Sequence, residues 1–145
     1  MEARMSKLAF LNDWFEQVWI GGDLDQIERF YAPQAEACGV MRDFSMGPED
    51  FRALIPAMMR LIDGLEIEVL RHIETEEWLW VLLRVRARVR ATAAPVEFTA
   101  QISTKFQDGK IREAYNHFDM LGFFEQIGAL PDQSLALVMI GETFS

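Results

Sequence analysis

Three side chains that can exchange protons recur at every second position near the end of the sequence. Tyr115, His117 and Asp119 alternate with Asn116 and Phe118 in the stretch YNHFD. In a β-strand, alternate side chains point to the same face of the sheet, so these three groups would share one face. On a buried face they could transfer protons to and from a bound molecule, and on a solvated face they would only contact water.

The strand that carries these residues is predicted by a hairpin turn at Asp108-Gly109. Asp-Gly is a common two-residue turn of type I′ between antiparallel strands. Gln107 then lies opposite Lys110, and if pairing continues without a bulge, the three polar groups lie on the apolar side of the hairpin. That side carries Phe98, Ala100, Ile102 and Phe106. Groups buried there must bond one another, water or a ligand, because an unpaired buried polar group is costly.

The rest of the sequence predicts helices first and a sheet afterwards. Apolar residues at helical spacing predict helices over about 5–20 and 48–62, with a short helix between them that ends near Phe30. Residues 33–46 show no period and are expected to form a loop. From Glu66 to Phe118 the period becomes two, which predicts three or four antiparallel strands. Two short helical segments end the sequence, so the expected class is α+β.

Length and composition indicate one soluble domain over residues 1–145. Half of the 145 residues are hydrophobic, which is ample for a closed core. The net charge of -9 disfavours nucleic acid and anionic membrane surfaces as partners. A lone Cys38 allows no intramolecular disulfide and fits a reducing compartment, and no signal peptide or membrane span is evident. We therefore expect a cytoplasmic location.

Four arginines alternate along RVRARVR at residues 84–90. This pattern suits either an anion-binding surface or a ladder of cross-strand ion pairs. Since Glu66, Glu68 and Glu97 alternate in the same way on the neighbouring predicted strands, the ladder on the outer face is favoured.

Metal and cofactor sites are not predicted. His72 and His117 are the only histidines, and no His, Cys and acid cluster has ligand spacing. The sequence also lacks a Gly-rich phosphate loop, since Gly21-Gly22 follows a helix rather than a strand.

Four segments, taken in order, resemble the SnoaL-like polyketide cyclase group of the nuclear transport factor 2-like superfamily. They are FLNDWFEQVWIGGDLDQIERFYAPQAEACG, MGPEDFRALIPAMM, KFQDGKIREAYNHFD and FFEQIGALP. The resemblance implies a cone-shaped fold, in which a strongly curved antiparallel sheet wraps the N-terminal helices and leaves an apolar pocket at its open end. It also implies a homodimer. In cyclase members an acidic residue near the end of the last strand is the acid/base, and by position this residue is Asp119.

Each candidate catalytic residue has a structural alternative. A carboxylate such as Asp119 in an apolar pocket has its pKa raised towards the working pH, which suits proton removal from carbon and proton delivery to a carbonyl oxygen. Asp119 could instead cap the helix that begins near Met120. His117 could assist proton transfer or be a core histidine, and Tyr115 could donate to an oxyanion or form pocket wall.

The remaining pocket wall is expected from apolar residues on the buried faces of helices and strands. The residues assigned to the pocket are Tyr115, Trp14, Phe98, Ile102, Phe30 and Met58. Such a wall favours a small hydrophobic molecule. Two functions stay open: a cyclase or isomerase that acts on a small hydrophobic carbonyl compound through Asp119 and His117, and a non-catalytic module of the same fold that binds a small molecule or only a second copy of itself.

Overall fold

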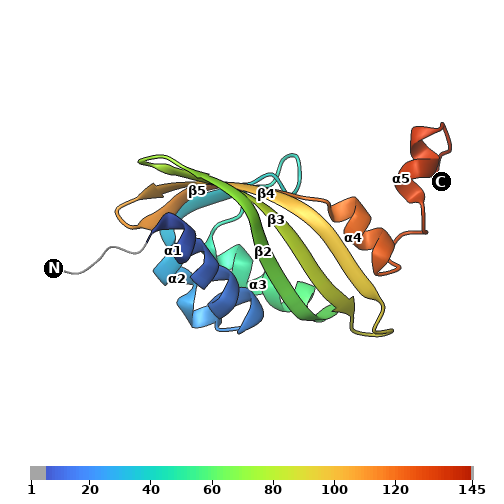
Figure 1. Ribbon diagram of the computed structural model, residues 1–145, viewed down its shortest axis with the longest axis horizontal. Coiled ribbons are helices and arrows are strands. Elements are labelled where there is room, and N and C mark those ends of the chain that lie inside the picture. Colours follow the sequence, from blue (N-terminus) through green and yellow to red (C-terminus); the bar gives the residue numbers. More distant parts are fainter. Residues whose placement is uncertain (1–5, 145) are drawn as a thin grey trace.

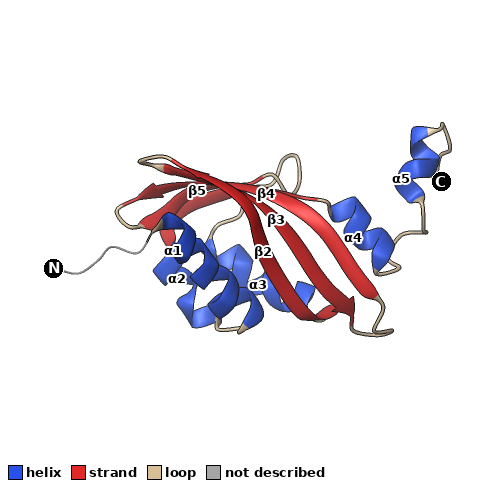
Figure 2. Cartoon of the chain, viewed as in Figure 1, coloured by secondary structure: helices blue, strands red, loops and turns tan. Residues whose placement is uncertain are grey.

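A curved sheet wraps around the N-terminal helices in the computed structural model, which describes residues 6–144 (Figures 1 and 2). Helices α1, α2 and α3 lie on the concave face of the sheet, α4 follows the end of β5, and α5 extends away from the body. The helical elements are α1 (Lys7–Trp14), the π-helical η1 (Phe15–Ile20), the 3-10 turn η2 (Leu24–Gln26), α2 (Ile27–Phe30), α3 (Pro48–Met59), α4 (Met120–Gln126) and α5 (Ser134–Met139).

Five strands form the sheet, in the order β1-β5-β4-β3-β2. They are β1 (Tyr31–Cys38), β2 (Ile62–Glu74), β3 (Trp78–Val89), β4 (Pro95–Gln107) and β5 (Lys110–Phe118). Strands β2 to β5 are antiparallel neighbours, and β1 runs parallel to β5 at the edge. The α+β class and the curved sheet that the sequence predicts are therefore confirmed.

Residues 33–46 were expected to form a loop, and for residues 33–38, which lie in β1, this expectation is wrong. The pairing of β1 with β5 is interrupted between Tyr31 and Glu36, so the buried residues of β1 do not alternate regularly. A period of two is the main sequence signal for a half-buried strand, and the interruption removes it. The sheet consequently has five strands rather than three or four.

The hairpin between β4 and β5 begins as predicted and then shifts by one residue. Gln107 lies opposite Lys110, but Lys105 pairs with Glu113 rather than Arg112. Arg112 is thus the extra residue of a β-bulge, and its guanidinium donates to the Gln34 carbonyl oxygen of β1 at 2.9 Å. Because strand side chains alternate, a shift of one residue exchanges the two faces for the remainder of β5.

This shift overturns the predicted orientation of the polar triplet. Ala114, Asn116 and Phe118 face the helices, whereas Tyr115 and His117 lie on the outer face and are exposed. The expectation that Tyr115 lies on the buried side is therefore wrong.

Glu113 supplies the physical reason for the bulge. Without the bulge, the Glu113 carboxylate would lie opposite Thr104, which is fully buried on the inner face. A buried carboxylate without a cation partner is strongly unfavourable. The bulge places Ala114 opposite Thr104 instead, and Ala114 is fully buried.

The outer face of the sheet carries the predicted ladder of ion pairs. Arg84 contacts Glu68 at 3.2 Å and Glu97 at 3.7 Å, and Arg86 contacts Glu97 at 2.7 Å. The Arg86 guanidinium beside Glu97 lowers the pKa of that carboxyl. Glu66 lies opposite Arg86 in the register of β2 and β3. The ladder of ion pairs is therefore confirmed for Arg84 and Arg86.

The other two arginines of this segment have separate partners. Arg88 contacts Asp63 at 3.2 Å, whereas Arg90 donates to the backbone carbonyl oxygens of Met59 and Ile62.

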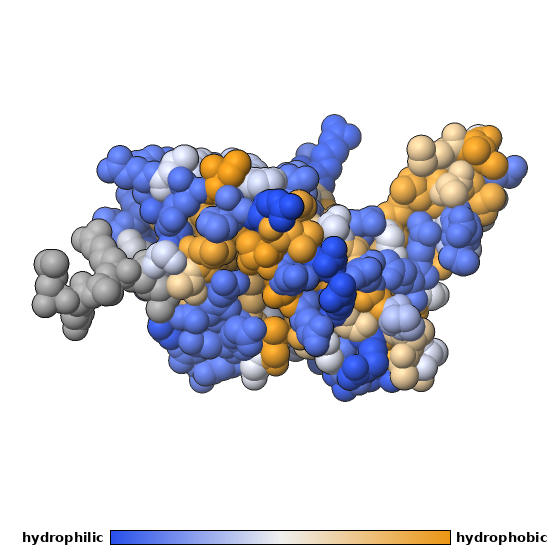
Figure 3. All heavy atoms as spheres, in the orientation of Figure 1, coloured by the Kyte–Doolittle hydropathy of each residue, from blue (hydrophilic) through white to orange (hydrophobic). Residues whose placement is uncertain are grey.

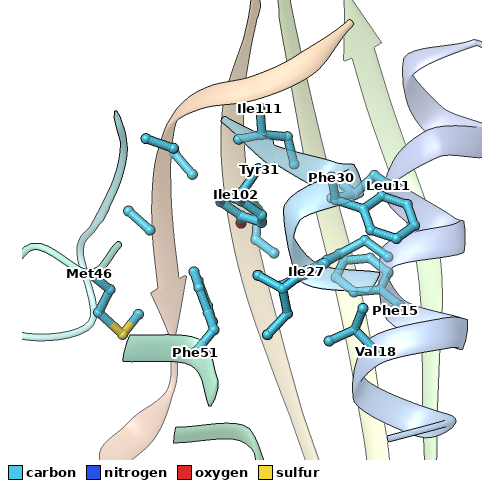
Figure 4. Packing of buried hydrophobic residues seen from close by; sticks show 14 of the residues in the cluster. Leu11, Phe15, Val18, Ile27, Phe30, Tyr31, Met46, Phe51, Ile102 and Ile111 are labelled. Carbon is cyan, nitrogen blue, oxygen red and sulfur yellow. The ribbon is translucent and has the colours of Figure 1, made fainter. Parts of the chain in front are cut away.

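The core fills the space between the first helices and the inner face of the sheet. Figure 4 shows Leu11, Phe15 and Val18 facing Ile27 and Phe30, with all five side chains buried. The π-helical turn η1 continues α1 without a break and widens the helix there.

The C-terminal segment is the least covered part of the molecule. In Figure 3 apolar surface gathers on α5, and the exposed apolar side chains there are Leu135, Val138, Met139, Ile140 and, after the helix, Phe144. Among residues 6–144 no helix is both long enough and apolar enough to cross a membrane.

Candidate functional site

A cavity of about 110 Å³, partly open to solvent, lies between the helices and the inner face of the sheet. Its helical wall includes Trp14, Phe15 and Trp19 from the first helix, together with Phe51, Leu54 and Met58 from α3. Its sheet wall includes Leu83, Val85, Phe98, Ile102 and Phe118. The cavity is therefore enclosed by elements from both halves of the sequence.

The chemistry of the cavity wall is apolar and uncharged. None of the described residues that line it is Asp, Glu, His, Lys or Arg. Apart from the two indoles, the polar side chains in the wall are those of Tyr31 and Asn116. A molecule that enters this space exchanges water for hydrocarbon and aromatic surface, which favours an uncharged apolar occupant.

Asn116 places an amide in the wall. Its residue is 5% exposed, it lies on the inner face of β5 opposite Ile102, and no side-chain hydrogen bond to it occurs among residues 6–144. Its backbone is fixed from the β1 side by Gly39, where φ is +100° and a Cβ atom would lie 2.7 Å from the Asn116 carbonyl oxygen. Only glycine tolerates both this φ and this close approach.

Tyr31 contributes the second polar group. Its ring centre lies 4.7 Å from that of Trp14 and 5.0 Å from that of Phe51. Tyr31 lines the same cavity as Ile102 of the sheet. Burial raises the pKa of the Tyr31 hydroxyl, so this group stays protonated and able to donate at neutral pH.

Of the six residues assigned to the pocket from the sequence, four line the cavity, and Phe30 and Tyr115 do not. Trp14, Met58, Phe98 and Ile102 lie together in the cavity wall. Phe30 lies in the core behind the wall, with its ring centre 5.0 Å from Phe10 and 5.7 Å from Trp14.

Tyr115 lies outside the cavity, on the opposite face of the sheet. It is 38% exposed, stacks on Trp78 at 6.4 Å between ring centres, and its hydroxyl donates to the Glu113 carboxylate. This hydrogen bond raises the pKa of Tyr115. His117 is also exposed and lies opposite Gln101 on the same outer face.

Asp119 caps α4, as the structural alternative expected. Its carboxylate accepts a hydrogen bond from the Gly122 backbone N–H at 2.9 Å, and its side chain is exposed. Its neighbours Phe118 and Met120 both line the cavity, but Asp119 does not. The roles of Asp119 and His117 in catalysis stay predictions.

Sequence reasoning missed the polar residues of the wall. Pairing continued without the bulge at Arg112 places Asn116 on the side opposite the triplet, and Tyr31 directly follows the short helix that was predicted to end near Phe30. The signal for Asn116 was present in Glu113: any register that buries Ile111 by strict alternation also buries this acid.

Metal ligation has no support in the part of the chain that the structure describes. No group of three or more His, Cys, Asp and Glu side chains there has a geometry that could hold a metal ion.

Comparison with known proteins identifies the fold. A model of the SnoaL-like domain matches residues 11–114. The match ends before the YNHFD stretch, so it does not cover His117 or Asp119. No curated protein sequence matches the chain at a significant level.

Several solved structures share the fold at low sequence identity. AclR, a proposed hydroxylase from Streptomyces galilaeus, is 19% identical with a TM-score of 0.72, and the match covers 92% of this chain and 87% of AclR. IdmH, a proposed polyketide cyclase from Streptomyces antibioticus, is 18% identical with a TM-score of 0.72, and the match covers 86% of this chain and 99% of IdmH.

A third structure contains a small molecule. It is a protein of ketosteroid isomerase-like fold from Catenulispora acidiphila in complex with trimethylamine, 10% identical with a TM-score of 0.70, and the match covers 85% of this chain and 95% of that chain.

Replacement of Asp119 tests its structural role. Asp119→Ala removes the acceptor for the Gly122 N–H, and we expect a loss of about 1 kcal/mol in the free energy of unfolding. This corresponds to a melting temperature lower by about 2–4 °C, measured by calorimetry. Asp119→Asn is the matched control, because Asn caps helices as well as Asp and should melt like the unaltered protein. Equal melting temperatures for all three proteins would contradict the cap.

Proposed function

The chain belongs to the SnoaL-like domain family, and on this basis we propose that it binds a small, uncharged, apolar molecule in the cavity between its helices and its sheet. The observation that carries this proposal is the composition of the cavity wall. The wall contains aromatic and aliphatic side chains, one amide, and no side chain that is charged at neutral pH. An ion taken from water into such a space would lose its hydration without gaining a partner.

A cationic occupant is the main alternative, since one solved structure of this fold contains trimethylamine. Cations bind over open faces of aromatic rings. Here the rings of Trp14, Tyr31 and Phe51 pack on one another with centres 4.7–5.3 Å apart, so neighbouring rings cover part of these faces. No carboxylate lines the cavity to accompany a cation either. These contacts support a neutral ligand.

Three probes of similar size and different charge test this proposal. Acetophenone is neutral, benzoate is anionic and benzylammonium is cationic at pH 7. We expect acetophenone to bind with a Kd on the order of 0.01–1 mM, as suits a ligand of its size. The two ions should bind at least about tenfold more weakly, because each must be desolvated. Titrations followed by 1H–15N NMR would measure all three.

A pair of variants on β3 locates the binding. Val85→Phe adds bulk to the cavity wall and should weaken acetophenone binding, whereas Leu82→Phe adds bulk to the outer face and should not. Tighter binding of either ion, or equal binding by both variants, would argue against the proposal.

A second candidate function is acid–base catalysis on a carbonyl compound, with Asp119 as acid/base and His117 assisting. The observation that favours it is the position of Asp119 between Phe118 and Met120, which both line the cavity. For this chemistry the Asp119 carboxylate must exchange its bond with the Gly122 N–H for contact with the bound molecule. It would then take a proton from the carbon beside the carbonyl group and return a proton to that carbon or to the oxygen.

Proton exchange on acetophenone tests this second function. In D2O, a base that removes a methyl proton leaves an enolate, and a deuteron from solvent then replaces the proton. A positioned base contributes about 10²–10⁴-fold, so the NMR signal of the methyl group should decay at least about tenfold faster with the protein than with Asp119→Asn. Equal rates for the two proteins would exclude this role of Asp119 towards the probe.

Homodimer formation and a cytoplasmic location complete the proposal. The outer face of the sheet, where Trp78 stacks on Tyr115, is the surface on which we propose that two copies meet. Sedimentation equilibrium should give twice the chain mass of 16.7 kDa, and a mass near 16.7 kDa at high concentration would contradict the dimer.

A further inference from the structure

We infer that Asn116 is the residue that recognises the polar end of the ligand, and that this end is a carbonyl or another neutral hydrogen-bond acceptor. The inference rests on the proposed binding function and narrows the ligand to a class: an apolar body that carries an acceptor. Asn116 lies outside the segment matched by the family model, which ends at residue 114.

The first argument is the position of the amide. Asn116 is 5% exposed and lies in the apolar cavity wall, and no hydrogen bond to its side chain occurs among the residues that the structure describes. Its amide atoms are not sealed from water, since the buried side-chain atom that lacks a hydrogen-bond partner among these residues is an oxygen of Asp63. An apolar molecule that enters the cavity beside the amide displaces water from it, so a ligand that pairs with the amide replaces that hydrogen bond and one that cannot pair loses affinity.

The second argument is the precision with which the backbone holds Asn116. The bulge at Arg112 turns it inwards, and the Arg112 guanidinium fixes the bulge through the Gln34 carbonyl oxygen of β1. Gly39, also from the β1 side, packs directly on the Asn116 backbone. A recognition group is most effective on a rigid element, because little conformational freedom is lost on binding.

The third argument concerns the kind of group that the wall can satisfy. The Asn116 amide offers two N–H donors, and Tyr31 offers an O–H donor that burial keeps protonated. A ligand acceptor without a polar hydrogen of its own can take a hydrogen bond from either residue. Asn116 and Tyr31 thus present three polar hydrogens in this wall, two from the amide and one from the hydroxyl, and a carbonyl oxygen of the ligand finds a donor on either residue.

Two isosteric probes and one substitution test this inference. α-Methylstyrene has the shape of acetophenone, with a methylene group in place of the carbonyl oxygen. Asn116→Leu should weaken acetophenone binding about tenfold, since the carbonyl oxygen loses its donor, and should leave α-methylstyrene binding unchanged or tighter. The ratio of the two effects isolates the coupling between Asn116 and the carbonyl group from the difference in hydrophobicity of the probes.

A direct spectroscopic readout uses the unaltered protein. The side-chain NH2 signals of Asn116 are assigned by their loss in the Asn116→Leu spectrum, or through bonds from its backbone signals if that variant does not fold. Acetophenone at saturation should shift these signals, and α-methylstyrene should shift them by much less. Gln101→Leu is the matched control, because it removes an amide from the outer face of β4 and should alter neither titration.

The outcomes separate this inference from the proposed function. If both probes bind and shift the Asn116 amide equally, or if Asn116→Leu shows no coupling, the assignment of Asn116 is overturned while binding in the cavity stands. If neither probe binds the unaltered protein, both proposals are overturned. Selective weakening of acetophenone binding together with a selective shift of the amide supports the inference.

Discussion

The functional geometry of this protein depends on a one-residue bulge in β5. The bulge keeps the Glu113 carboxylate out of the core, because strict alternation from Ile111 would place it against the buried Thr104. Every residue after it on β5 then faces the opposite side from the one that a plain hairpin would give. The desolvation of a single carboxylate thus decides that an amide and a phenyl ring, rather than a phenol and an imidazole, reach the cavity.

The same displacement explains why the chain presents few groups for proton transfer at its cavity. Tyr115 and His117 meet solvent on the outer face, where Tyr115 pairs with Glu113. Asp119 comes after the strand and holds the first turn of α4 through the Gly122 N–H. A carboxylate in this position satisfies the backbone donors of the helix, and any chemistry would have to compete with that bond. The cavity itself is left to apolar side chains and two neutral polar groups.

Local patterns in the sequence predicted most of the helices and strands. The features that they did not predict, strand β1 and the inward position of Asn116, depend on pairing between segments. The helical period located α1 and α3, the Asp-Gly turn located the hairpin, and the alternation of arginines and glutamates located the ladder. Strand β1 escaped because its pairing with β5 is interrupted, which removes the period of two. The inward position of Asn116 escaped because the hairpin was extended by strict alternation, although the acid at Glu113 indicates a bulge between Ile111 and Glu113.

A neutral amide changes the kind of selectivity that this cavity can have. A carboxylic acid or an imidazole recognises a ligand in one protonation state only, so its affinity follows pH. The Asn116 amide does not titrate, and burial raises the pKa of Tyr31 away from neutral pH. Recognition of a ligand through these two groups would therefore be independent of pH across the neutral range. Asn116 lies on the inner face of β5, His117 lies on its outer face and Asp119 follows its end, so the neutral amide is separate in space from the groups proposed for proton transfer.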